Sequence, residues 1–189
     1  MIILAKGVAV MMVLMIVAHD GFRDEEYFKP KALLESAGYS VVTGSTLAGP
    51  ARGKLGGKAR ADIALADVRT TDYAAVVFVG GPGAYDYYND RNALRIAREA
   101  VGQDLTVGAI CSAPGILARA GVLKGKKATV FPSDADELRR AGAFYREEPV
   151  VVTGKLVTAN GPAAAEQFGR ELVKLLNELN ASKNSQTVQ

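Results

Sequence analysis

The sequence predicts an α/β fold, a three-layer sandwich in which a mostly parallel sheet is covered by helices on both faces. Short, continuous apolar runs of the kind that form buried parallel strands alternate along the chain with segments of helical periodicity. The 189 residues suit one domain, and no internal repeat or linker-like stretch divides them. We therefore expect a single domain over residues 1–189, with its core over about 12–179.

The first apolar run, residues 2–18, has two interpretations. It is interrupted only by Lys6, and its second half resembles the core of a signal peptide. However, it is shorter than the ~20 residues of a membrane span, and it ends in Ala18-His19-Asp20 rather than in the small residues of a cleavage site. We favour a buried strand over residues 12–18 and a cytoplasmic protein. Residues 1–10 are then an extension or the product of an upstream start.

The segment after the first strand is expected to be helical. Asp24 is positioned to cap a helix over residues 25–37, and Pro30 inside that span predicts a kink or a late start. A short strand is expected over residues 39–43. Residues 48–59 contain four glycines and one proline, which predicts a loop or an irregular hairpin.

The rest of the chain repeats the strand-and-helix alternation. Strands are expected over residues 74–79, 106–110, 128–131, 144–146, 150–152 and 156–159. Helices are expected over residues 89–101, 113–120, 133–141 and 162–179, and the polar tail from Ala181 is expected to fray.

Composition excludes several classes of function. Lys and Arg total 23 against 20 Asp and Glu, and the basic residues are scattered, which is unlike a nucleic-acid footprint. A single cysteine, Cys111, excludes an intrachain disulfide, and a single histidine, His19, excludes a site with two imidazoles. The glycine loop at residues 80–83 lacks the lysine of a phosphate-binding loop. We expect no metal, cofactor, nucleic-acid or membrane partner, and a small molecule as substrate.

Cys111 has the sequence context of a nucleophile elbow. An apolar strand precedes it, and the small residues Ser112 and Ala113 open a helix after it. A helix N-terminus lowers the pKa of a thiol, and the backbone N–H groups of Ser112 and Gly81 are candidate donors to an oxyanion. The competing interpretation is an inert cysteine, because free cysteine is among the most buried residue types.

Parallel strands also bring other polar residues to the same edge of the sheet. His19 is a candidate base if its loop folds over Cys111, although a lone histidine is commonly a surface residue. Four carboxylates follow it and ordinarily form a solvated helix start, whereas one of them reaching the thiol is the functional interpretation. These carboxylates are Asp20, Asp24, Glu25 and Glu26.

The run Ala109-Ile110-Cys111-Ser112-Ala113-Pro114 resembles the elbow of the superfamily of PfpI-type intracellular peptidases and the Parkinson-associated deglycase (DJ-one/PfpI). Gly80-Gly81 resembles its oxyanion loop, and residues 118–129 and 158–162 resemble further stretches. The resemblance covers about residues 12–179. It implies a class I glutamine-amidotransferase-like fold, a homo-oligomer, and cysteine-dependent chemistry on small carbonyl compounds or adducts, of the glyoxalase or deglycase type.

Three positions depart from the family pattern. Members commonly carry a glutamate after the phenylalanine of the first loop, and matching Phe22 and Pro30 to that motif puts Arg23 there. Ser112 stands where peptidase-like members have a histidine, and Phe131 stands where deglycase-like members have one. The resemblance therefore assigns only Cys111, Gly81 and the Ser112 backbone.

The acid that serves the thiol is expected to have moved. We favour Glu25, with Asp24 or Asp20 as alternatives, and Arg23 is a competing activating group. Arg23 pointing to solvent or pairing with a neighbouring carboxylate is the other interpretation.

Two further functions compete with a glyoxalase or deglycase. One is a cysteine peptidase, weakened because no histidine adjoins the cysteine. The other is a non-enzymatic redox-sensing or stress-protective protein whose Cys111 is oxidised. A scaffold without chemistry at the cysteine is also consistent with the sequence. For assembly, residues 48–59 and the first helix are the expected contact regions.

Overall fold

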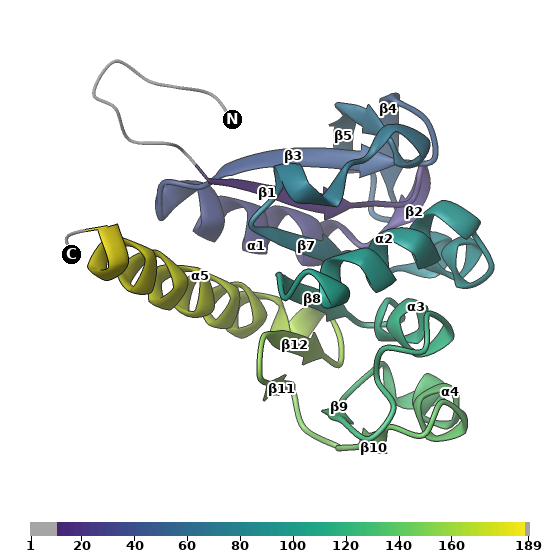
Figure 1. Cartoon of the computed structure of the whole chain (residues 1–189). Helices are drawn as coiled ribbons and strands as arrows, with labels where there is room; N and C mark the ends of the chain where they lie inside the picture. The colour runs from purple at the N-terminus through teal and green to yellow at the C-terminus, as the bar shows by residue number, and fades with distance from the viewer. Residues whose placement is uncertain (1–10, 188–189) are drawn as a thin grey trace.

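The structure is a computed structural model that describes residues 11–187, with side chains described as far as residue 182. Within this range a seven-stranded sheet forms the centre of the molecule (Figure 1). Neighbouring strands run parallel, except that β11 is antiparallel to β12. In spatial order the strands are β11 (Val150–Thr153), β12 (Leu156–Ala159), β8 (Thr106–Ile110), β7 (Ala75–Phe78), β1 (Met12–Ile16), β3 (Ser40–Ser45) and β6 (Ile63–Ala64).

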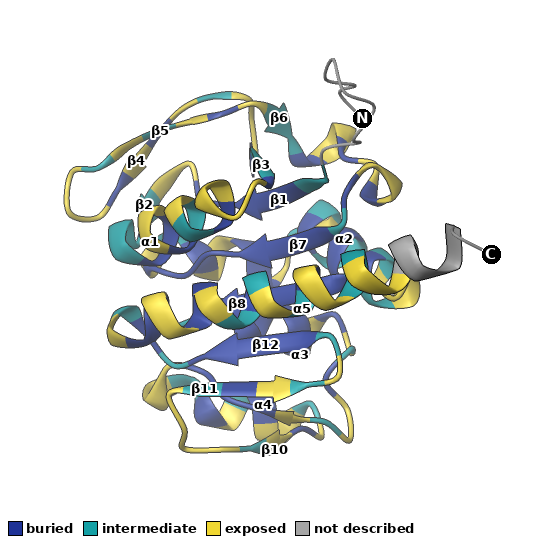
Figure 2. Cartoon of the chain, turned by 90° about the vertical axis from the view of Figure 1, so that its left-hand side faces the viewer, coloured by how far each residue is buried: buried dark blue, intermediate teal, exposed yellow. Residues whose placement is uncertain are grey.

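Helices cover both faces of this sheet, which confirms the three-layer prediction. One face carries α1 (Asp24–Ser36) and α5 (Ala165–Thr187), which lie in front of the buried strands in Figure 2. The other face carries α2 (Arg91–Gly102) and α3 (Pro114–Arg119), with α4 (Ala135–Arg140) beside α3.

The side chains of β1 alternate between two hydrophobic cores. Val13 and Met15 belong to the core beneath α1 and α5, and Leu14 and Ile16 belong to the core beneath α2 and α3. All four side chains are fully buried. A strand buried on both faces has no polar side to expose, which explains its continuous apolar sequence.

Two small sheets lie outside the central one. They are formed by β2 (Asp20–Phe22), β4 (Gly49–Gly53) and β5 (Lys58–Ala61), and by β9 (Lys127–Ala128) with β10 (Phe144–Tyr145). Short 3-10 helices complete the elements: η1 (Leu65–Asp67), η2 (Thr70–Asp72), η3 (Pro82–Tyr88), η4 (Pro132–Asp134) and η5 (Pro162–Ala164).

The glycine-rich segment predicted as a loop or irregular hairpin is the antiparallel hairpin β4–β5. The carboxylate of Asp24 accepts hydrogen bonds from the backbone N–H groups of Leu55 (2.8 Å) and Gly57 (2.6 Å) in its turn. Asp24 therefore anchors the hairpin, and the prediction that it caps α1 is wrong. The N-cap residue is Arg23, whose side chain makes no capping bond.

Most predicted elements are present, with shifted ends. The strand expected over residues 128–131 is reduced to β9, and the helix expected from Ser133 begins as the 3-10 turn η4. Instead of fraying at Ala181, α5 continues to Thr187. The strand interpretation of the first apolar run is confirmed by β1, while the expected extension over residues 1–10 lies outside the described residues. No helix in the described chain is long and apolar enough to cross a membrane.

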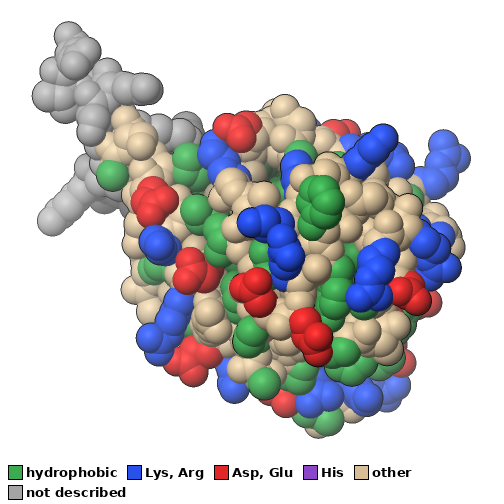
Figure 3. Space-filling view, turned by 90° about the horizontal axis from the view of Figure 1, so that it is seen from below, with side chains coloured by type: hydrophobic (Ala, Val, Ile, Leu, Met, Phe, Trp, Pro, Cys, Tyr) green, Lys and Arg blue, Asp and Glu red, His purple; other side chains and the backbone are tan. Residues whose placement is uncertain are grey.

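Charged side chains of both signs are mixed on the face shown in Figure 3. On α4, for example, Arg139 pairs with Asp136 at 2.7 Å. This mixing follows from the scattered charges of the sequence and creates no broad field of one sign on that face.

Candidate active site

Three chain segments meet at the carboxyl edge of the central sheet. They follow β1, β7 and β8, which are neighbours in the sheet and run parallel. The backbone N–H of Arg23, after β2, donates to the carbonyl of Gly80 at 2.9 Å. The N–H of Cys111 donates to the carbonyl of Ala159 at the end of β12 (2.8 Å). The edge predicted from the strand ends is thus where Cys111 and the glycine loop meet the start of α1.

Cys111 occupies a sharp turn between β8 and α3. Its φ of 63° is left-handed, a conformation shared among non-glycine residues of the described chain only by Asp104. Backbone hydrogen bonds hold the turn on both sides, since the Cys111 carbonyl also accepts from the N–H of Phe131 at 2.8 Å. This strained strand-to-helix turn has the geometry of a nucleophile elbow and leaves the thiol half-buried.

The carboxylate beside this thiol belongs to Glu26. Its side chain projects from the first turn of α1, is fully buried, and finds no conventional hydrogen-bond partner among the described residues. A Cβ atom on Gly80 would lie 2.6 Å from both Glu26 Oε2 and Cys111 Cβ, which shows how closely the two groups approach. The interactions of this carboxylate are therefore with the thiol and with the Gly80 backbone.

Burial dominates the protonation of this pair. Burial raises the pKa of Glu26 to about 7, while the adjacent Cys111 thiol and the charge of Arg23 act in the opposite direction. Burial, and next the Glu26 charge, raise the pKa of the Cys111 thiol, whereas the N–H groups of Ser112 and Gly81 lower it. The two groups titrate as a coupled pair. Both shifts favour the neutral thiol near neutral pH, and transfer of its proton to the Glu26 carboxylate would give a thiolate beside a protonated acid.

The expectation that a helix N-terminus lowers the pKa of Cys111 is therefore corrected. The following helix, α3, has only six residues, and burial next to a second acid outweighs the backbone N–H groups that face the sulfur. Desolvation disfavours the charged form of any acid, and a neighbouring carboxylate disfavours it further.

Gly81 and Ser112 place two backbone N–H groups at the Cys111 sulfur. Gly81 has φ 106°, and a Cβ atom there would lie 2.5 Å from the Arg23 nitrogen and 2.6 Å from the Gly21 oxygen. Only glycine fits this position. The structure thus brings together Cys111, Gly81 and Ser112 as the sequence predicted, with both amides near the place where an oxyanion would form.

The carboxylates favoured from the sequence lie elsewhere. Glu25 accepts two hydrogen bonds from the Arg23 guanidinium, at 2.8 and 3.2 Å, which hold the pKa of Glu25 below its usual value. Asp24 holds the β4–β5 turn. Successive helical residues point about 100° apart, so only one residue of the first turn of α1 faces the thiol. The expected placement of Glu25 and Asp24 at Cys111 is wrong, and Glu26 takes that place.

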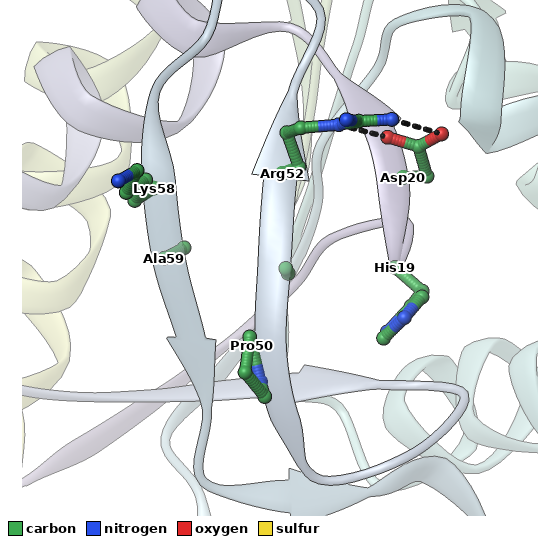
Figure 4. Close-up of a pocket in the computed structure, with 7 residues that line it drawn as sticks. His19, Asp20, Pro50, Arg52, Lys58 and Ala59 are labelled. Atoms are coloured by element: carbon green, nitrogen blue, oxygen red, sulfur yellow. Dashed lines mark hydrogen bonds and ion pairs between the residues drawn. The ribbon is translucent and has the colours of Figure 1, made fainter.

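His19 and Asp20 belong to a different surface, shown in Figure 4. They line a cavity of about 610 Å³, and Cys111 is not part of its wall. The remaining lining residues lie on β4 and β5: Pro50, Ala51, Arg52, Lys58 and Ala59. Asp20 forms two hydrogen bonds with Arg52 there, at 3.0 and 3.3 Å. The idea that the loop of His19 folds over the cysteine finds no contact to support it among the described residues.

Aromatic residues border the elbow on the side of η3. Tyr85 donates to Asp134 at 2.8 Å and packs edge-on against Tyr88, while Phe131 is 40% exposed.

Among the described residues, no group of three or more His, Cys, Asp or Glu is arranged to hold a metal ion. The site therefore consists of a thiol, a buried acid and two N–H donors, a set suited to attack on an electrophilic carbon.

Comparisons with known proteins agree with this geometry. The model of the DJ-1/PfpI family matches residues 11–175. A Methanocaldococcus jannaschii protein without an assigned function is 43% identical over 89% of this chain and 83% of its own length. A protein named deglycase from Pyrococcus abyssi is 32% identical (86% and 98%), and the Bacillus subtilis "Putative cysteine protease YraA" is 37% identical (83% and 94%).

A solved structure has the same fold. The ThiJ/PfpI domain protein from Brachyspira murdochii matches with a TM-score of 0.88 and 35% identity, covering 90% of this chain and 99% of that one. The names of the relatives differ in activity, so the chemistry has to be argued from this chain's own residues.

Proposed function

Because this chain belongs to the DJ-1/PfpI family, we propose that it uses Cys111 and Glu26 to convert small reactive carbonyl compounds such as methylglyoxal. The observation that carries the proposal is the buried Glu26 carboxylate against the Cys111 thiol. An acid whose pKa is near the working pH can both accept and return a proton, which is the requirement for this chemistry.

In the proposed reaction the Cys111 thiolate attacks the aldehyde carbon, and the carbonyl electron pair moves onto oxygen. The N–H groups of Gly81 and Ser112 stabilise the resulting oxyanion. Glu26 protonates the oxygen, then takes the proton from C1 and delivers it to C2, while the hydroxyl proton passes from the C1 oxygen to the C2 oxygen. These transfers convert the hemithioacetal into a thioester. Water hydrolyses the thioester, so that methylglyoxal and one water become lactate and the thiol is regenerated. A related adduct on an amine or thiol would be released by the same attack and hydrolysis.

A peptidase activity has less support from the site. The residue after the cysteine is Ser112, whose hydroxyl is already committed as a donor to the Gly81 carbonyl at 3.0 Å. The chain's one histidine, His19, is exposed and lines the separate cavity of Figure 4. No imidazole therefore stands beside the thiol to protonate the leaving amine of a peptide.

The test is to incubate the protein with methylglyoxal and measure lactate formation. Wild type and Glu25→Gln are expected to turn over within twofold of each other, whereas Cys111→Ala and Glu26→Gln lose at least 100-fold. Glu25 is the matched control because its carboxylate is adjacent in sequence but faces Arg23. Hydrolysis of a casein substrate without lactate formation would replace the proposal with a peptidase. Loss of the thiol under peroxide, without turnover, would replace it with redox sensing.

A further inference from the structure

The hydroxyl of Ser112 joins the two backbone segments that surround the Cys111 sulfur. Ser112 is 2% exposed, and its Oγ donates to the carbonyl of Gly81 at 3.0 Å. The same carbonyl accepts from the N–H of Ala84 at 3.1 Å, which closes the first turn of η3. The side chain that follows the nucleophile thus fixes the loop that carries the second N–H donor.

Ser112 is also held through its backbone. Its carbonyl accepts a hydrogen bond from the Tyr88 hydroxyl at 2.8 Å. A Cβ atom at Gly115 would collide with that hydroxyl, so the helix after the elbow has glycine where the tyrosine passes. Arg119 lies over the Tyr88 ring, 5.7 Å from its centroid, and pairs with Glu137. Ser112 is therefore tied to both ends of η3, through its hydroxyl to the Gly81 carbonyl before the first turn and through its carbonyl to the hydroxyl of Tyr88, the last residue of η3.

We propose that the Ser112 hydroxyl is a positioning group that locks the nucleophile elbow to the glycine loop and thereby sets the spacing of the two N–H donors around the Cys111 sulfur. The inference rests on the proposed function for its effect on turnover, but its effect on the thiol is independent of any substrate. Donors fixed in advance stabilise a developing anion more than donors that must be reoriented. A histidine directly after the cysteine would supply a base, whereas Ser112 at this position holds the glycine loop in place.

The experiment compares Ser112→Ala with Ser112→Thr, which keeps a hydroxyl, and with Thr106→Val. Thr106 lies at the other end of β8 and is fully buried. Its hydroxyl has no hydrogen-bond partner within the described part of the chain, so it controls for the removal of a buried hydroxyl as such. Because Cys111 is the only thiol in the sequence, iodoacetamide alkylation and thiolate absorbance at 240 nm report on this residue alone. Both are measured against pH, alongside kcat and KM for methylglyoxal.

For Ser112→Ala we expect the rate of alkylation at pH 7 and kcat each to fall about tenfold, while KM stays within twofold of wild type. This loss is smaller than the ~100-fold that removal of a whole hydrogen-bond donor costs. Thr106→Val should match wild type, and Ser112→Thr should recover most of the loss. Ser112→Ala with an unchanged pH profile of alkylation would overturn the proposal. If Ser112→Ala does not fold, Tyr88→Phe, which removes the other anchor, takes its place with the same two outcomes. Should wild type lack turnover, the proposed function fails, while alkylation and absorbance still decide the role of Ser112.

Discussion

The Glu26 carboxylate and the Cys111 thiol lie together against Gly80, so closely that a Cβ atom there would be 2.6 Å from both Glu26 Oε2 and Cys111 Cβ. One group comes from the first turn of α1 and the other from the end of β8. Their contact determines how the site holds its proton.

Replacing Glu26 by glutamine should lower the apparent pKa of the Cys111 thiol. The neutral amide removes the charge that opposes thiolate formation, and the burial of the site is unchanged. Turnover should nevertheless fall, because the proton carrier is gone. Thiolate absorbance against pH measures the first effect, and Glu25→Gln is the control. A thiol that titrates identically in both variants would show that Glu26 is not its partner.

The same variant should change the pH dependence of stability. The folded-state pKa of Glu26 is raised from 4.5 to about 7, so its contribution to stability is fully present below pH 4.5 and is lost as the pH rises through 7. The free energy of unfolding of Glu26→Gln, relative to that of wild type, should therefore rise by about 3 kcal/mol between pH 4.5 and pH 8. Urea unfolding at both pH values measures this gain, and a difference independent of pH contradicts it.

A Gly80→Ala substitution should damage the site and the fold together. The added methyl group has no room beside Ile110 O, Cys111 and Glu26, and overpacking of this kind costs about 1–3 kcal/mol. Gly102→Ala at the end of α2 is the matched control, because a Cβ atom there meets nothing within 4 Å. We expect slower Cys111 alkylation at pH 7 only in the first variant. Equal alkylation rates in the two variants would contradict the close packing described.

Asp24→Ala should loosen the β4–β5 hairpin without affecting the thiol. The substitution removes a charged acceptor from the N–H groups of Leu55 and Gly57, which is worth about 1.5–3 kcal/mol. Hydrogen exchange of those two amides should accelerate, while the pH profile of Cys111 alkylation stays that of wild type. A shifted alkylation profile would return Asp24 to the list of groups that act on the thiol.

The central strands were predictable because burial on both faces leaves a distinctive sequence. The runs that form β1 and β7 are continuously apolar, and their positions follow from that alone. Short elements were not predictable in the same way. Of the run expected at residues 128–131, only Ala128 pairs with β10, and this pairing depends on where the partner segment lies.

The identity of the acid was missed because a motif match fixed the wrong register. Residues 24 to 26 are all acidic, and composition does not distinguish them. The helical face does: Glu26 lies four and eight residues before Pro30 and Leu34, which are buried on the inner side of α1. Placing the carboxylates on that face would have selected Glu26. The anchoring of Asp24 to the hairpin, in contrast, depends on a tertiary contact that no local pattern reveals.

The left-handed backbone at Cys111 reverses the usual order of stability between glycine and alanine. Elsewhere glycine is less stabilising than alanine, but at φ 63° a side chain costs about 1 kcal/mol that glycine avoids. Cys111→Gly should therefore unfold at a higher urea concentration than Cys111→Ala, and the opposite order would show that the turn is unstrained. The strain at this turn is thus a cost to folding that a cysteine carries and a glycine would avoid.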